Sequence, residues 1–93
     1  MDTFIKAMIC ELVNKVCDIH LHTTCEADIK VNLQVGSITI IIGHSDRMLD
    51  WFDPIYYTTL YFKHDNEKTF AQSYLDTMLD LQQVSRNNAI ILI

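Results

Sequence analysis

Glycine and proline are scarce in this chain of 93 residues, which contains two glycines and one proline. Flexible linkers and low-complexity tails are rich in such residues, so the composition predicts neither. The chain also has no internal repeat. Hydrophobic residues make up 49% of the sequence, enough for an ordinary core without disulfides or metal. We therefore predict one domain over residues 1–93.

Basic residues are also few, since 7 Lys and Arg stand against 12 Asp and Glu, for a net charge of −5. An acidic chain repels phosphates, which disfavours direct nucleic-acid binding but not binding of a basic protein. The opening MDTFIKAMICELV is neither a signal peptide nor a membrane span, so we expect no membrane association. Three cysteines without a secretory signal predict reduced thiols in the cytoplasm.

The stretch ADIKVNLQVGSITIIIG, residues 27–43, predicts a β-hairpin around which the chain is organised. Apolar and polar residues alternate from Ile29 to Val35, as in a half-buried strand. Gly36 and Ser37 predict a two-residue type II′ turn, because glycine tolerates positive φ. This turn sets the expected register. It pairs Val35 with Ile38, Leu33 with Ile40 and Val31 with Ile42 on the apolar face, and Gln34 with Thr39 and Asn32 with Ile41 on the other.

Two helices and two further strands complete the predicted fold. Apolar steps of three and four residues predict a helix over 3–19, widened by Cys10 and Cys17, and residues 20–26 connect it to the hairpin. Residues 55–63 predict a third strand with Tyr56, Thr58, Leu60 and Phe62 inward. A second helix is expected to run to about Val84, with its buried side formed by Phe70, Ala71, Tyr74, Leu75, Met78 and Leu81.

The last five residues, AIILI (89–93), predict a short apolar strand that needs burial in this sheet or against a second copy. The expected fold class is α+β. It consists of an antiparallel sheet of three to four strands with two helices packed on one face, in the order α-β-β-β-α-β.

A cluster of metal-ligand residue types lies in CDIHLHTTC, residues 17–25. Cys17, His20, His22 and Cys25 are thiolate and imidazole candidates of the kind that zinc favours. The spacing is not that of the usual paired knuckles, and there is no second cysteine pair. The alternative is that Cys17 packs in the core and the histidines lie in a loop or at a strand edge. We expect no metal and no cofactor.

The segment DIHLHTT also resembles the opening Asp-x-His-x-His-Thr motif of the PHP metal-dependent phosphoesterases. That resemblance implies that His20 and His22 are metal ligands at the end of a barrel strand, and IIIGHSD (residues 40–46) is faintly similar to the second motif of the family. The chain is too short for that barrel, the further ligand motifs are missing, and the segment follows a predicted helix.

The segment DRMLDWFDPIYY, residues 46–57, is the predicted contact surface for a partner protein. Trp and Tyr in loops are typical interface anchors, and flanking carboxylates favour a basic partner. The candidate contact residues are Met48, Asp50, Trp51, Phe52, Asp53 and Tyr57, with Asp76 and Asp80 of the second helix. The alternative is a short amphipathic helix in which Trp51 or Phe52 plugs the end of the core.

The open face of the sheet is a second candidate surface, because Tyr57 and Tyr61 are able to stack on bases. The order helix, three strands, helix is similar to that of the double-stranded RNA-binding domain. That family opens its second helix with lysines, whereas here Asp65, Asn66 and Glu67 precede Lys68. The resemblance therefore extends to the order of elements and not to the phosphate contacts.

We find no Gly-rich phosphate loop, nucleophile elbow or paired metal motif, so we expect no enzyme. Some phage-encoded inhibitors, including anti-CRISPR proteins, resemble the chain in size, charge and helix–sheet–helix order. The sequence therefore predicts a small protein-binding module, an acidic regulator or inhibitor of a basic nucleic-acid-handling protein, of phage or mobile-element type. The alternatives are a self-associating assembly subunit, joined through residues 89–93 or the hairpin edge, and a metal-binding protein using His20 and His22.

Overall fold

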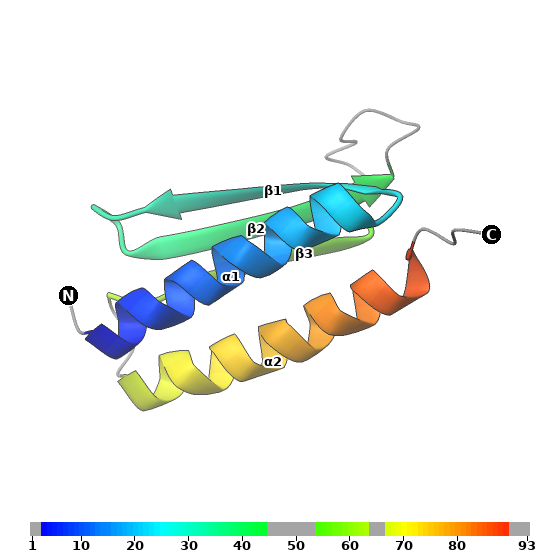
Figure 1. The fold of residues 1–93 in the computed structure, drawn as a ribbon. Coiled ribbons are helices and arrows are strands. Elements are labelled where there is room, and N and C mark those ends of the chain that lie inside the picture. Colours follow the sequence, from blue (N-terminus) through cyan, green and yellow to red (C-terminus); the bar gives the residue numbers. More distant parts are fainter. Residues whose placement is uncertain (1–2, 45–53, 64–66, 90–93) are drawn as a thin grey trace.

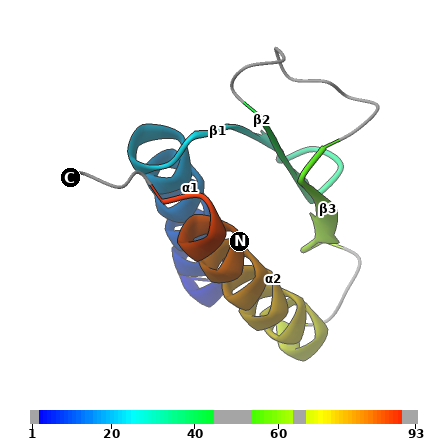
Figure 2. The ribbon, with the colours of Figure 1, turned by 90° about the vertical axis from the view of Figure 1, so that its right-hand side faces the viewer.

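The computed structural model describes residues 3–44, 54–63 and 67–89. The elements are α1 (Thr3–His22), β1 (Cys25–Asn32), β2 (Ser37–His44), β3 (Tyr56–Tyr61) and α2 (Glu67–Asn87). The strands form one antiparallel sheet in the order β1-β2-β3, and both helices lie on one of its faces (Figures 1 and 2). The predicted α+β class and the order of the first five elements are confirmed.

The predicted last strand falls mostly outside the described residues, because residues 90–93 are not among them. Ala89, which is described, forms an isolated antiparallel bridge with Thr23. Next to it, the Thr24 N–H donates to the Asn88 C=O at 3.0 Å. The end of α2 is thereby tied to the segment that connects α1 to β1.

Helix α1 packs through a narrow apolar stripe of Ile9, Leu12, Val16 and Ile19, all of them buried. It continues to His22, beyond the predicted end at Ile19, and there Thr23 donates its N–H and its hydroxyl to the Ile19 C=O. These bonds satisfy a carbonyl that the end of the helix leaves unpaired. Cys10 and Cys17, predicted to widen the buried stripe, are exposed instead, because they lie beside the narrow stripe of α1 that packs in the core.

The hairpin forms with a different register from the predicted one. Val31 pairs with Ile38, Ile29 with Ile40 and Ala27 with Ile42, so residues 33–36 make a four-residue loop. The Asn32 carboxamide accepts the N–H groups of Gln34 and Val35 at 3.1 and 3.0 Å, an Asx turn that ends the strand early. Gly36, with a φ of 80°, closes the loop by donating its N–H to the Asn32 C=O at 2.8 Å.

The difference between the two registers is four residues, an even number, so the side chains keep their predicted faces. Ile38, Ile40 and Ile42 therefore still point to the helices and are fully buried. All five predicted pairs are wrong, because Leu33, Gln34 and Val35 lie in the loop and Val31 and Asn32 pair with Ile38 and Ser37 instead. Leu33 and Val35 are consequently exposed.

Strand β3 faces the helices as predicted. Leu60 and Phe62 are buried, Tyr56 packs against the core, and Tyr57 and Tyr61 are exposed. The Phe62 ring meets Phe70 of α2 edge to face, with 6.1 Å between the ring centres. This contact joins the far end of the sheet to the start of α2.

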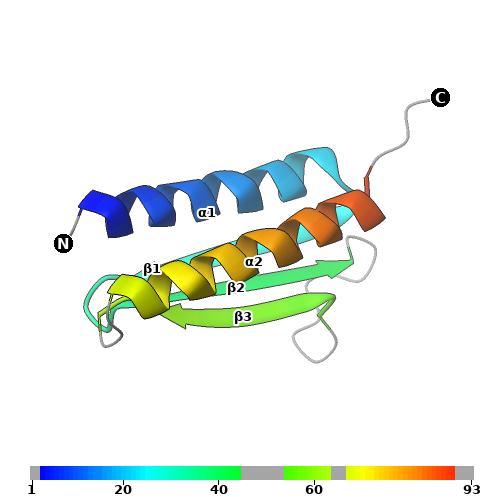
Figure 3. The same cartoon turned by 90° about the horizontal axis from the view of Figure 1, so that it is seen from below.

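Helix α2 runs to Asn87, three residues beyond the predicted end, and lies beside α1 over the sheet (Figure 3). Phe70, Thr77, Leu81 and Val84 are its buried residues. The prediction that Leu75 is buried is wrong, since 54% of its surface is exposed. The buried face is centred on Phe70 and Leu81, which lie three turns apart on one side of the helix, and Leu75 lies too far round the helix from that line.

The two helices are joined by a hydrogen bond in which the Tyr74 hydroxyl donates to the Glu11 carboxylate. Partial burial and the neighbouring Glu11 carboxylate raise the pKa of Tyr74 from 10.0 to about 12. The folded state therefore keeps this proton at a pH where the unfolded chain loses it. The associated stability is fully present below pH 10 and is lost as the pH rises through the folded pKa.

We expect Tyr74→Phe to lower the free energy of unfolding at neutral pH by about 1 kcal/mol or less, since the bond is close to solvent. Urea unfolding between pH 8 and pH 12 should show a steeper loss of stability for the wild type than for Tyr74→Phe. The loss of stability of Glu11→Gln should be intermediate in steepness, because burial still raises the pKa of Tyr74 in this variant although the Glu11 carboxylate is gone. Identical slopes in all three proteins would contradict the assignment.

We also expect Gly36→Ala to destabilise the fold by about 2 kcal/mol or more. An added Cβ would lie 2.0 Å from the Lys63 Cβ, at a φ of 80° that side chains other than glycine rarely adopt. Gln34→Ala, an exposed substitution in the same loop, should change the free energy of unfolding by less than about 0.5 kcal/mol. Equal effects in chemical denaturation would show that the close approach to Lys63 is unimportant.

Candidate protein-binding surface

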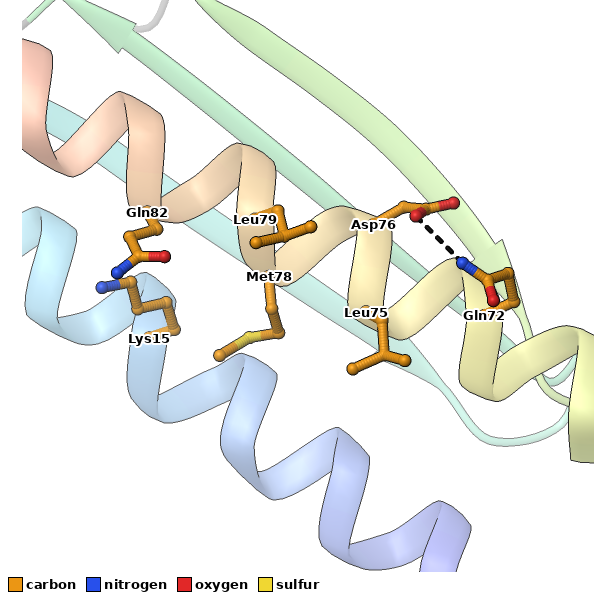
Figure 4. A pocket seen from close by; sticks show the side chains of 7 residues that line it. All are labelled: Lys15, Gln72, Leu75, Asp76, Met78, Leu79 and Gln82. Carbon is orange, nitrogen blue, oxygen red and sulfur yellow. Dashed lines mark hydrogen bonds between the residues drawn. The ribbon is translucent and has the colours of Figure 1, made fainter.

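A groove runs between α1 and α2 on the side of the helix pair that faces away from the sheet (Figure 4). It has a volume of about 490 Å³. Six of the residues that line it belong to α2 and one, Lys15, to α1. The α2 residues are Gln72, Leu75, Asp76, Met78, Leu79 and Gln82.

The floor of the groove is apolar because α2 carries more leucines than its buried face holds. Leu75 and Leu79 lie one helical turn apart, and they are 54% and 65% exposed. Met78 is half-buried and packs against the core beneath them. Two neighbouring leucines on the outer side of a surface helix depart from the usual polar exterior, and such departures concentrate at functional sites.

Polar groups stand at opposite ends of this groove. The Gln72 amide donates to the Asp76 carboxylate at 3.1 Å, whereas Lys15 extends beside Gln82 at the other end (Figure 4). The groove therefore offers an apolar strip between one carboxylate and one ammonium group. Its lining residues contain no thiol, hydroxyl or imidazole, so this arrangement is suited to holding an apolar side of a ligand.

Asp80, the other predicted contact residue of α2, lies on the side of the helix that faces β3. It accepts a hydrogen bond from the Tyr56 hydroxyl at 3.1 Å. Burial of the ring and the Asp80 carboxylate both raise the pKa of Tyr56. Asp80 therefore links α2 to the edge of the sheet, one turn from Asp76.

Tyr57 lies on the face of the sheet that the helices leave open, where it is 58% exposed. It stands in one row with Ile41 and Asp28 across the three strands. Ile41 is buried although it points to this face. The structure thus places Tyr57 on the opposite layer from Asp76 and Asp80 and does not bring the three together. The remaining predicted contact residues, Met48, Asp50, Trp51, Phe52 and Asp53, lie outside the described residues.

The open face carries few charges beside its tyrosines. The row next to Tyr57 holds Lys30, Thr39 and Thr59, and the two threonine hydroxyls lie 3.2 Å apart in a hydrogen bond. A basic stripe of the kind that nucleic-acid-binding sheets use is not formed by these rows. The order of elements agrees with the resemblance to the double-stranded RNA-binding domain, and the similarity extends no further.

The cysteine and histidine cluster is divided between two elements. Cys17, His20 and His22 lie on the last turns of α1 and are exposed, whereas Cys25 is buried at the start of β1. Within the described residues, no three His, Cys, Asp or Glu side chains are grouped to hold a metal ion. The alternative interpretation is wrong in placing Cys17 in the core, because the thiol is exposed.

His20 instead has a backbone partner, since its Nδ1 accepts the Ala27 N–H at 3.3 Å. The segment that resembles the PHP motif therefore ends a helix that packs on a three-stranded antiparallel sheet. In the phosphoesterases the motif lies at the end of a barrel strand, so the structural context that the resemblance implies is not present in the described fold.

The chain matches no protein-family model, and neither a curated protein nor a solved structure matches it. Neither of the two described helices has the length and apolar character that crossing a bilayer requires. The assignment of a function therefore depends on the surfaces described above.

Sequence reasoning missed the groove although one signal was present. The apolar positions 74, 75, 78, 79 and 81 cover more than one side of a helix, so a single buried face cannot hold them all. The predicted buried stripe includes Leu75 and leaves out Leu79. Only the packing of α2 against α1 decides which of these residues are left at the surface.

We expect two of the three thiols to react with Ellman's reagent in the native protein, namely Cys10 and Cys17, because they are exposed. Cys25 should react only after unfolding. Equimolar zinc should leave the rate at Cys17 unchanged, with Cys10 as the internal reference. Protection of Cys17 by zinc would instead favour the metal-binding alternative.

Proposed function

We propose that the protein is a small non-enzymatic protein-binding module that receives an amphipathic helix of its partner in the groove between α1 and α2. The observation that carries this proposal is the exposure of Leu75 and Leu79 on the floor of that groove. In helix-in-groove recognition the apolar face of a partner helix packs on an apolar groove, and Leu75 and Leu79, one turn apart on α2, give this groove its exposed apolar surface.

The contribution of the two leucines is large enough to matter for binding. Complete burial of a leucine side chain is worth about 1.5–3 kcal/mol. Because somewhat more than half of each residue is exposed, covering both should contribute about 2–3 kcal/mol in total. This is the size of a typical interface hot spot. Lys15 and Asp76, at the two ends of the groove, would orient the bound helix.

The charge of the chain supports a basic partner. A net charge of −5 attracts a basic surface and speeds encounter with it. Asp76 at the rim of the groove places a carboxylate beside the contact surface, whereas Asp80, one turn away, lies on the side of α2 that faces β3. The sharper form of the proposal is an acidic regulator or inhibitor of a basic nucleic-acid-handling protein, acting in the cytoplasm and of viral or mobile-element type.

The test compares three immobilised baits, namely the wild type, Leu75→Ser/Leu79→Ser and Val35→Ser, in a lysate of the producing cell. Val35 is an exposed apolar residue of the hairpin loop and serves as the matched control. We expect basic proteins to be enriched on the wild type and on Val35→Ser. Their capture should fall at least about tenfold on the double variant, since about 2 kcal/mol is lost.

Capture should also weaken when the salt concentration is raised, because rim charges are screened. Thermal unfolding of the double variant checks that it stays folded, as expected for two substitutions at the surface. Equal capture on all three baits would show that the groove is not the contact surface. Enrichment of acidic proteins alone would refute the basic-partner form of the proposal.

A further inference from the structure

The outer edge of β1 carries backbone groups that no described strand pairs with, since the sheet order is β1-β2-β3. Two hydrogen bonds show which residues point to that edge. The Cys25 N–H donates to the Thr23 hydroxyl at 3.1 Å, and the Ala27 N–H donates to His20 Nδ1 at 3.3 Å. In an antiparallel pair, every second residue directs its N–H and C=O away from the partner strand. Ile29 and Val31 therefore also direct these groups outward.

The edge opens progressively along the strand. Cys25 is buried, residues 26–29 are half-buried and residues 30–32 are exposed. Thr23 and His20 accept from the N–H groups at the covered end, so within the described part of the chain the outward N–H groups without a partner lie at Ile29 and Val31. An open edge of this kind is a template for pairing with another strand.

We propose that β1 pairs with β1 of a second copy of the chain, antiparallel and about a two-fold axis at Ile29. Ile29 then exchanges both backbone hydrogen bonds with its symmetry mate. The Val31 N–H donates to the C=O of the partner's Ala27, and the Ala27 N–H exchanges its bond to His20 for one to the C=O of the partner's Val31, so the His20 ring moves away from the edge. The two sheets become one continuous sheet with all four helices on the same face.

The charges of β1 favour this axis, because it brings opposite charges together without opposing like ones. An axis at Asp28 or at Lys30 would place two like charges directly opposite each other, which is destabilising. An axis at Ala27 would oppose Asp28 to the partner's Glu26. With the axis at Ile29, Asp28 stands opposite the partner's Lys30, and the same pair recurs by symmetry. Asp28 and Lys30 point to the same face of the sheet, so both pairs form there.

The helix side of the edge fits the same register. A hollow of about 310 Å³ lies between α1 and β1, lined by Val16, Cys17, His20, Leu21, Ala27, Asp28 and Ile29. In the Ile29-centred pairing, Val31 of the partner subunit stands opposite Ala27 and points to the helix side, into this hollow. Val31 is 37% exposed and Leu21 is 67% exposed in the single chain. Pairing therefore covers two exposed apolar residues of each copy.

The test measures the mass of the purified protein by sedimentation equilibrium over a range of concentrations. We expect a dimer of two 10.8 kDa chains. Asp28→Lys and Lys30→Asp each place like charges across the interface and should weaken the dimer at least about tenfold. The double variant Asp28→Lys/Lys30→Asp restores opposite charges and should recover it. Lys6→Asp, the same charge change on α1, should have no effect.

Hydrogen exchange provides a second measurement that needs no variant. The amides of Ile29 and Val31 should become protected as the protein concentration rises, whereas the exposed Gln34 amide should not change. A monomer at every concentration overturns the proposal. A dimer that withstands both single charge reversals also overturns it, and deletion of residues 89–93 or Leu75→Ser/Leu79→Ser would then locate the true interface. The groove proposal is unaffected by either outcome, because its baits test other residues.

Discussion

The helix-facing side of β2 is the constraint on which the other elements depend. Ile38, Ile40 and Ile42 are fully buried there. They pair with Val31, Ile29 and Ala27 on one side and with Leu60, Thr58 and Tyr56 on the other. Both helices close over this row, α1 through its Leu12 and Ile19 line and α2 through Phe70 and Leu81. Because the side of this central strand that faces the helices is wholly apolar, the helices have to cover it to remove it from water.

The two helices do not bury all of their apolar residues, and those left exposed form the surface that we assign to binding. Each helix buries one apolar stripe in the core, and α2 carries further leucines outside its stripe. The outward leucines border α1, so they form a groove instead of isolated exposed residues. The open side of the sheet and the edge of β1 are two separate surfaces. The first is formed by the strand residues that point away from the helices, and the second is formed by backbone groups of β1.

Much of the fold could be predicted because the relevant signals are local. The alternation around Ile38–Ile42, the apolar steps of α1 and the inward set of β3 each lie within one element. The register of the hairpin could not be predicted, since it depends on the Asn32 carboxamide and on the approach of Gly36 to Lys63, which is 27 positions further along the chain. The position of Leu75 was missed for a similar reason, because only the neighbour of a helix fixes its buried side. Tyr57, Asp76 and Asp80 were chosen by residue type, which contains no information on the layer where each side chain lies.

The even offset between the two hairpin registers has a consequence for how the chain folds. A hairpin with the two-residue turn would present the same row of isoleucines to the helices as the native one does, so hydrophobic burial alone separates the two states weakly. The native loop distinguishes them through Asn32 and Gly36. A change from one register to the other would require breaking the ladder of β1 and β2. The loop at residues 33–36 therefore selects the native register through the contacts of Asn32 and Gly36.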